Sequence, residues 1–249
     1  MRRPAAFFPI TLTLGVILVA EPDAQAAPTA ITACQTINQP GSYVLANNLT
    51  ASGNCLTITV NFVTIDLAGF SISGPGGIGA NGILAVAPSP TTPLRGIAVR
   101  NGSISNFDNG VDIGVAGGSI VEGLRVFGST HQGINANGVV KGNTVENNRE
   151  FGILAGGIVT ENYATGNDIG IAINTGILSW NTAGAQLEGN RIGMLAISAT
   201  LIGNTAAFNT DVGISVDCPA NLTDNTAINN PTNLSLNGTD CHNEDNVAP

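Results

Sequence analysis

The chain has 249 residues, of which only 10% are charged, and its formal net charge is −9. An acidic chain of this kind repels nucleic acid and anionic membrane surfaces, so we expect neither as a partner. Its 32 glycines argue against a fold built from long helices.

The first 26 residues have the organisation of a secretory signal peptide. Residues 1–3 are MRR and supply a basic start, residues 5–20 are apolar, and residues 24–26 form a small-x-small cleavage site. A retained membrane anchor is the alternative, but the apolar run is short and Pro9 interrupts it. We therefore expect cleavage before Ala27, a secreted, periplasmic or cell-surface protein, and no membrane span in the remaining chain.

Residues 27–249 are expected to form a single domain, because no composition shift marks an internal boundary. We expect residues 27–55 to cap the open N-terminal end, residues 56–236 to form repeated coils, and residues 237–249 to be a polar tail. The first repeated unit contains two runs, at 56–60 and 63–67, in which apolar residues alternate with polar ones. A period of two predicts strands with one buried face.

A longer interruption of the repeats lies between Gly74 and Arg95. It contains several glycines and a proline-rich run from Pro88 to Pro93. We expect an inserted loop that stands off the repeats, and two interpretations stay open. It either borders a binding groove or is a plain surface insertion.

A repeat of about 20 residues organises the chain from residue 137 to residue 230. One asparagine recurs with spacings of 19, 19, 23 and 21 residues, and an amide follows it after five residues in every unit. An aliphatic residue precedes the asparagine by three positions, and a small apolar residue follows it by two. The recurring asparagines are Asn143, Asn162, Asn181, Asn204 and Asn225, the later amides Asn148, Asn167, Gln186, Asn209 and Asn230, and the aliphatics Val140, Val159, Leu178, Leu201 and Leu222. A fixed period of this length predicts a solenoid.

Most units also contain a Gly-Ile pair or a close variant, followed by an alternating apolar pattern, as in Gly133-Ile134 and Gly152-Ile153. Leucine-rich repeats need more leucines per unit, and helical repeats are longer, about 33–47 residues, so neither fits. The pattern therefore predicts short strands joined by Gly and Asn corners. Asparagine suits a corner because it tolerates a left-handed backbone and bonds to its own backbone. We expect the recurring asparagines to stack as a structural amide ladder; a row of sugar- or ion-binding groups is the weaker alternative.

These Asn and Gly-Ile columns resemble the parallel β-helix proteins of the pectin-lyase-like superfamily, over residues 56–236. The resemblance implies an all-β, single-stranded right-handed parallel β-helix of about eight or nine coils by the repeat count. It implies no specific enzyme family. Asn209-Thr210-Asp211 matches the first motif of polygalacturonases, but their Asp-Asp, Gly-His-Gly and Arg-x-Lys motifs are absent from the sequence. The alginate-epimerase motif and the calcium-binding carboxylate cluster of pectate lyases are absent as well.

The four cysteines are spaced for disulfides between neighbouring coils. Cys34 and Cys55 are 21 residues apart, and Cys218 and Cys241 are 23 apart, so each separation is about one coil. Equivalent residues of adjacent coils lie about 4.8 Å apart, which a disulfide can span. We expect both pairs to be oxidised in an exported protein. No metal site is expected, because no two cysteines lie close together and the two histidines are far apart in sequence.

A column of charged residues is the main candidate site. Lys141 lies two residues before its ladder asparagine, and the equivalent residues of the two preceding coils are Glu122 and Arg100. Arg125 is on one of these coils. Such a cluster suits the binding of an acidic sugar, with Arg gripping a carboxylate; the alternative is a cross-strand ion-pair ladder of little energetic value, which we favour.

Exposed aromatic rings are the other feature that a carbohydrate site would need. Trp180 and Tyr163 lie on neighbouring coils and would form either one small stacking platform or ordinary corner packing.

The sequence thus predicts an exported β-helix protein with a non-catalytic binding or structural role, engaging a polysaccharide along one sheet face. The alternative is a polysaccharide lyase or glycoside hydrolase with an unrecognised site. A third possibility, delivery of copper, is implied by β-helix relatives with that role. It is disfavoured by two histidines, two methionines and paired cysteines. No cofactor is expected.

Overall fold

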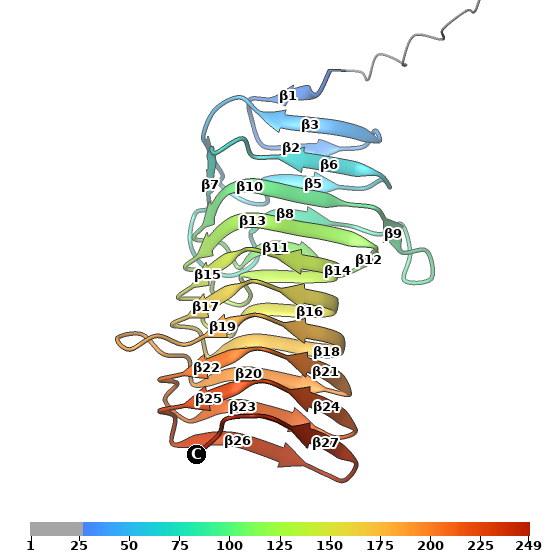
Figure 1. Ribbon diagram of the computed structural model, residues 1–249. Coiled ribbons are helices and arrows are strands. Elements are labelled where there is room, and N and C mark those ends of the chain that lie inside the picture. Colours follow the sequence, from blue (N-terminus) through green and yellow to red (C-terminus); the bar gives the residue numbers. More distant parts are fainter. Residues whose placement is uncertain (1–26) are drawn as a thin grey trace, which may run out of the picture.

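The computed structural model describes residues 27–249, so the predicted signal peptide lies outside the described residues. Strands and turns build this part of the chain, which contains no helix. The strands pair in parallel and wind into one continuous coil of about 10 turns (Figure 1). The predicted parallel β-helix is therefore confirmed. The predicted count of eight or nine coils is too low, because strands form at both ends of the described chain.

Each full turn contributes strands to three stacked faces. The first face stacks β1 (Thr29–Ile31), β3 (Gly41–Leu45), β6 (Val63–Asp66), β10 (Ala98–Ser105), β13 (Ser119–Phe127), β14 (Ile134–Lys141), β16 (Phe151–Thr160), β18 (Ile169–Ser179), β21 (Ala199–Ile202), β24 (Ala220–Thr223) and β27 (Cys241–Glu244). The longer strands bend around a corner and contribute to a second face as well.

The second face stacks β4 (Leu49–Thr50), β7 (Ser71–Ser73), the C-terminal ends of β10 and β13, β15 (Thr144–Glu146), β17 (Tyr163–Thr165), β19 (Thr182–Ala183), β22 (Thr205–Ala207) and β25 (Thr226–Ile228). The third face stacks β2 (Gln35–Ile37), β5 (Leu56–Ile58), β8 (Asn81–Ala85), β11 (Asn109–Ile113), the N-terminal ends of β14, β16 and β18, then β20 (Ile192–Ile197), β23 (Val212–Asp217) and β26 (Thr232–Asn237).

The core lies inside the coil and consists of aligned apolar columns. The predicted aliphatic column is in register on successive strands of the first face, and each member is fully buried: Val140, Val159, Leu178, Leu201 and Leu222. The second face contributes Val145 and then Ala164, Ala183, Ala206 and Ala227, all buried. Because apolar area buried in this way is the main stabilising term, the alternating pattern fixes which side of every strand faces inward.

The predicted asparagine ladder is present and extends one coil further, to Asn246. The side-chain oxygen of Asn162 accepts hydrogen bonds from the backbone N–H of Asn143 at 3.0 Å and from its side-chain amide at 2.9 Å. The same arrangement recurs up the column and ends at Asn246, which accepts both bonds from Asn225 at 2.8 Å. Each buried amide is thereby satisfied by the next coil, which is the structural role expected for the column.

A second ladder runs through the later amides, but one predicted member is wrong. Asn190, rather than Gln186, accepts the bonds from Asn167. A short loop after β19 places Gln186 in solvent and brings Asn190 to the ladder position. The loop explains why Asn181 and Asn204 are 23 residues apart. The spacing in the sequence indicated an insertion but not its position.

The left-handed residues of the corners precede the ladder asparagines or the equivalent residues of the earlier coils. At the corner between the first and second faces they are Asn101, Gly123, Gly142, Glu161, Trp180, Gly203 and Asp224, with φ between 56° and 64°. The asparagine that follows turns inward and donates to a carbonyl two residues back, as Asn162 does to Thr160 at 2.9 Å. The prediction that asparagines make these corners is therefore correct for the local hydrogen bond, which the asparagine forms. The left-handed backbone conformation belongs instead to the residue before it.

The two predicted disulfides lie near the two ends of the described coil. Cys34 is bonded to Cys55, and Cys218 to Cys241, with Cα separations of 4.4 and 5.2 Å. Strands extend beyond the range of 56–236 predicted for the coils. At the N-terminal end β1 pairs with β3 and β2 with β5, and at the C-terminal end β27 pairs with β24. Two disulfides suit an oxidising compartment.

The interruption between residues 74 and 95 contains two strands and two projections. β8 keeps its place on the third face, while residues 74–80 and 86–93 leave the coil. The second projection leads to β9 (Leu94–Arg95), which pairs with β12 (Ala116–Gly117) outside the main sheet (Figure 1). Pro88 and Pro93 of this projection line an open hollow of about 430 Å³, together with Phe62 of the coil. In residues 27–249 we find no helix long and apolar enough to cross a membrane.

Candidate functional site

The structure places three of the four predicted site residues in one column on the first face. Arg100 is aligned with Glu122, and Glu122 with Lys141, on the adjacent strands β10, β13 and β14. Asp66 on β6 is aligned with Arg100 and extends the column by one coil. We call Asp66, Arg100, Glu122 and Lys141 the charged column. Thr160 and Ser179 continue it as neutral residues.

Only one pair of aligned residues in the charged column forms an ion pair. The Arg100 guanidinium lies 3.1 Å from the Asp66 carboxylate, and the Lys141 ammonium lies 3.5 Å from Glu161, which projects from the neighbouring corner. Glu122 stands between the two cations but forms no ion pair with any residue in 27–249. The Lys141–Glu161 pair is exposed, so it contributes little, about 0–1 kcal/mol, to stability, whereas the Arg100–Asp66 pair is half-buried.

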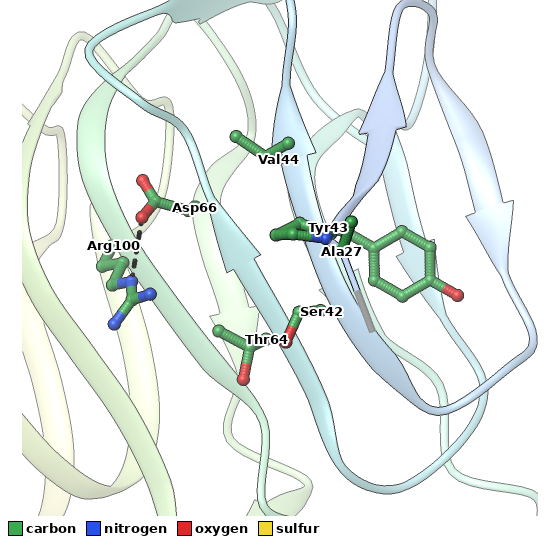
Figure 2. A pocket seen from close by; sticks show the side chains of 8 residues that line it. Ala27, Ser42, Tyr43, Val44, Thr64, Asp66 and Arg100 are labelled. Carbon is green, nitrogen blue, oxygen red and sulfur yellow. Dashed lines mark hydrogen bonds and ion pairs between the residues drawn. The ribbon is translucent and has the colours of Figure 1, made fainter. Parts of the chain in front are cut away.

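The charged column borders two surface hollows. The larger, of about 380 Å³, is lined by Ala27, Pro28, Ser42, Tyr43, Val44, Thr64, Asp66 and Arg100. Figure 2 shows Asp66 and Arg100 facing each other at one side of this hollow, with the Ser42 and Thr64 hydroxyls nearby. A smaller hollow of about 240 Å³ lies between the Glu122 and Lys141 side chains, beside the corner glycines Gly123 and Gly142.

Arg125 lies around the corner from the other three predicted residues. It is exposed on the second face, where it is aligned with Ser103 and Thr144. The left-handed Gly123 turns the chain between Glu122 and Arg125. The four residues therefore lie on three successive coils around one corner, and only Arg100, Glu122 and Lys141 share a face.

An apolar column runs beside the charged column on the first face. It consists of Ala98, Ile120, Val139, Ile158 and Ile177, aligned strand by strand. Ile120, Ile158 and Ile177 remain 40%, 44% and 40% exposed. Because these side chains point outward, polar residues could replace them without loss of core packing. Contiguous exposed apolar surface of this kind commonly marks a binding site. This column was not predicted from the sequence, because its residues occupy the outward positions of strands, where the alternating pattern leads one to expect polar residues.

A second titratable cluster, which sequence analysis also missed, lies between the second and third faces. His131 Nδ1 lies 2.5 Å from a carboxylate oxygen of Asp108, and His131 Nε2 lies 3.6 Å from Glu150 on the next coil. Thr130 and the Gly79 N–H also donate to Asp108, at 2.8 and 3.0 Å. The Gly-Ile register would have aligned Asp108 with His131, since each stands two residues before its glycine.

The hydrogen bonds of this cluster shift two pKa values. The bond to Asp108, together with the negative charges of Asp108 and Glu150, raises the pKa of His131 above its ordinary value of 6.5. Burial alone would raise the pKa of Asp108, but its bonds with His131, Gly79 and Thr130 hold that pKa below 3.8. The arrangement therefore favours the protonated form of His131, which lies between two carboxylates, and Asp108 orients the ring.

Asp211, the aspartate of the polygalacturonase-like motif, belongs to an ion-pair column in line with this cluster. Arg191 binds Asp168 with two bonds of 2.6 and 3.0 Å and lies 3.7 Å from Asp211. The hydrogen bond from Arg191 lowers the pKa of Asp168 below 3.8. This geometry agrees with the interpretation of Asp211 as a repeat position.

No group of three or more His, Cys, Asp or Glu side chains in residues 27–249 is arranged to hold a metal ion. Trp180 and Tyr163 lie near the corner between the first and second faces. Tyr163 is aligned with Thr182, two residues after Trp180. Trp180 is exposed and Tyr163 is half-buried.

Comparison with known proteins gives two structural neighbours. No family model matches the chain, and no curated protein matches it. ORF18 of Geobacillus virus E2 is 8% identical, with a TM-score of 0.43 over 83% of this chain and 54% of that one. The enzymatically active domain of bacteriophage CBA120 tailspike protein 2 is 12% identical, with a TM-score of 0.42 over 81% and 42%. The chain thus spans about half the length of either, and at such values neither neighbour identifies what it binds or does.

Proposed function

We propose that the protein is an exported, non-catalytic polysaccharide-binding protein whose binding surface is the first face between β6 and β18. The observation that supports this most is the parallel course of the charged column and the apolar column. Both follow the axis of the coil, and their residues repeat about every 4.8 Å. A linear polymer of repeating sugars presents polar groups and C–H surfaces at regular intervals, so it suits two such columns.

The charges favour an acidic glycan bound weakly. Residues 27–249 contain six Lys and Arg side chains, and three of them, Arg100, Arg125 and Lys141, lie within these coils. A uronate carboxylate can replace Glu161 beside Lys141, because that pair is exposed, or approach the part of the Arg100 guanidinium that Asp66 leaves open to solvent. Glu122 and the net charge of −9 oppose an anion, so the binding should weaken steeply as salt is added.

Binding to a soluble uronate polymer tests the proposal. Arg100→Ala combined with Lys141→Ala should weaken binding about tenfold, as expected for the loss of two charge-assisted contacts. The control, Arg149→Ala combined with Arg191→Ala, removes the same charge from other corners and should leave binding nearly unchanged. Arg125→Ala alone measures the contribution of the second face. Equal binding by both double variants would remove the first face from consideration.

Catalysis as a polysaccharide lyase or hydrolase is a second candidate, favoured by the Asp108–His131–Glu150 cluster. A histidine oriented by one carboxylate and facing another is a suitable group for proton transfer. The cations of the charged column, Arg100 and Lys141, lie on the first face and not beside this cluster. Depolymerisation of a uronate polymer by the wild type that His131→Asn abolishes would establish this candidate over the non-catalytic one.

A further inference from the structure

Trp180 occupies a backbone position that most of the other coils fill with a residue suited to a left-handed conformation. Its φ is 56°, and the same corner holds Gly142, Gly203, Asn101 and Asp224 on other coils, with Glu161 as the other exception. Glycine, asparagine and aspartate adopt this conformation readily, whereas a bulky side chain is strained there. Trp180 nevertheless remains 63% exposed, so burial offsets only part of the strain. A strained, exposed aromatic residue is a reason to look for a function.

The indole of Trp180 is held against the next coil. A Cβ atom placed on Gly203 would lie 2.6 Å from Cε3, 2.6 Å from Cζ3 and 2.9 Å from Cη2 of the indole. The ring therefore packs on the bare backbone of Gly203, which supports it while most of the residue faces solvent. A supported aromatic ring loses little further freedom when a ligand stacks on it.

Polar residues lie next to Trp180 along its own coil and at the same corner of the preceding coil. The Ser179 hydroxyl, adjacent in sequence, lies 3.1 Å from the Thr160 hydroxyl. Glu161, which occupies the same corner one coil earlier, pairs with Lys141. A pyranose ring has an apolar C–H face and hydroxyls around its rim, so it can stack on the indole and bond to such groups. Because the neighbours are polar, this site fits a sugar better than an apolar protein surface.

We infer that Trp180 is the stacking platform of a carbohydrate subsite at the corner beside the charged column, and that it binds a pyranose ring whether or not the sugar is charged. The inference rests on the proposed polysaccharide binding and adds a subsite that does not depend on Arg100 or Lys141. Stacking buries apolar surface, so this contribution should persist in salt that screens the charged column.

The chain provides a direct reporter, because Trp180 is its only tryptophan. Titration with a neutral glucan oligosaccharide should shift the tryptophan emission to shorter wavelength in a saturable manner, at low and at high salt alike. The same titration with an oligogalacturonate should shift it as well. An emission that stays constant while calorimetry detects binding of either probe would overturn the inference.

Two glycine substitutions separate stacking from backbone strain. Gly203 and Gly142 share the same corner and the same φ of 64°, but an added Cβ meets the indole at Gly203 and nothing within 4 Å at Gly142. Gly203→Ala should displace the ring and weaken glucan binding about tenfold, as Trp180→Ala should, whereas Gly142→Ala should not. Equal weakening by both glycine variants would contradict a stacking role for Trp180.

The outcomes also separate this subsite from the proposed function. Uronate binding that depends on Arg100 and Lys141 but leaves the emission unchanged would refute the subsite and keep the charged face. Glucan binding that depends on Trp180 and survives the double substitution Arg100→Ala, Lys141→Ala would support the subsite. Uronate binding that also survives this double substitution would refute the charged face while leaving the subsite standing. Loss of neither ligand in Trp180→Ala would refute the subsite.

Discussion

Asn162 donates its side-chain amide to the side-chain oxygen of Asn181, one coil further along, at 3.0 Å. The backbone N–H of Asn162 donates to the same oxygen at 2.9 Å. Both residues are almost fully buried. Asn181 thus satisfies two donors of the preceding coil, and its own amide donates to Val159 and Asn204.

Asn181→Ala should therefore lower the free energy of unfolding by about 3 kcal/mol, because it leaves several buried polar groups without partners. The midpoint of chemical denaturation is the appropriate measurement, since a repeat array need not unfold in two states. Gln186→Ala, in the exposed loop, is the control and should cost less than about 0.5 kcal/mol. A midpoint as high in Asn181→Ala as in the control would show that the ladder is not structural.

The ladder also shows what the sequence can predict. The inward columns, the ladder and both disulfides were predictable, because stacking identical coils turns a sequence period into a spatial column. Gln186 was assigned to the ladder wrongly because one unit contains an insertion. The spacing of the repeat gives the length of such an insertion but not its position within the unit. Asn190 still reaches the ladder since the buried position needs an amide.

The candidate site was less predictable for the same physical reason. The alignment of Arg100, Glu122 and Lys141 followed from the period and is confirmed. Asp66 lies 34 residues before Arg100, because residues 74–95 interrupt the coils, so its pairing with Arg100 could not be read from the spacing. Lys141 pairs with Glu161 because of the directions of the two side chains at the corner. A sequence repeat does not specify such directions.

Gly157 should be intolerant of any side chain. Its Cβ would lie 2.4 Å from the carbonyl oxygen of Gly138 on the preceding coil, and its φ is 108°. Gly157→Ala should therefore force the coils apart and lower the free energy of unfolding by more than about 2 kcal/mol. Gly142→Ala should lower it by only about 1 kcal/mol, because the sole penalty there is the left-handed backbone. Thermal denaturation of the two variants measures the difference, and equal melting temperatures would contradict the close approach at Gly157.

The disulfides should protect the ends of the coil. Replacing Cys218 and Cys241 by serine removes a disulfide between residues 23 apart in the sequence and should lower the free energy of unfolding by about 3 kcal/mol. Limited proteolysis followed by mass spectrometry should then find early cleavage C-terminal to Cys218, while the same treatment of a Cys34 and Cys55 double variant should release the N-terminal segment. Cleavage in the middle of the coil in both variants would contradict this role.

The stability of the protein should depend on the ionisation of His131. Asp108 raises the pKa of this histidine in the folded state above the ordinary value of 6.5. The stabilisation is therefore complete below 6.5 and is lost as pH rises through the higher pKa of the folded protein. Melting temperatures measured across this range should fall more in the wild type than in His131→Asn. A fall of the same size in both proteins would show that another group is responsible.

The account of function depends most on whether the first face binds an acidic glycan without cleaving it. One measurement tests both parts: titration of the wild type with a uronate polymer at low and high salt, followed by chain-length analysis of the recovered polymer. We predict saturable binding that weakens as salt is added, and a recovered polymer of unchanged length. A shortened polymer, or no binding even at low salt, would contradict the account.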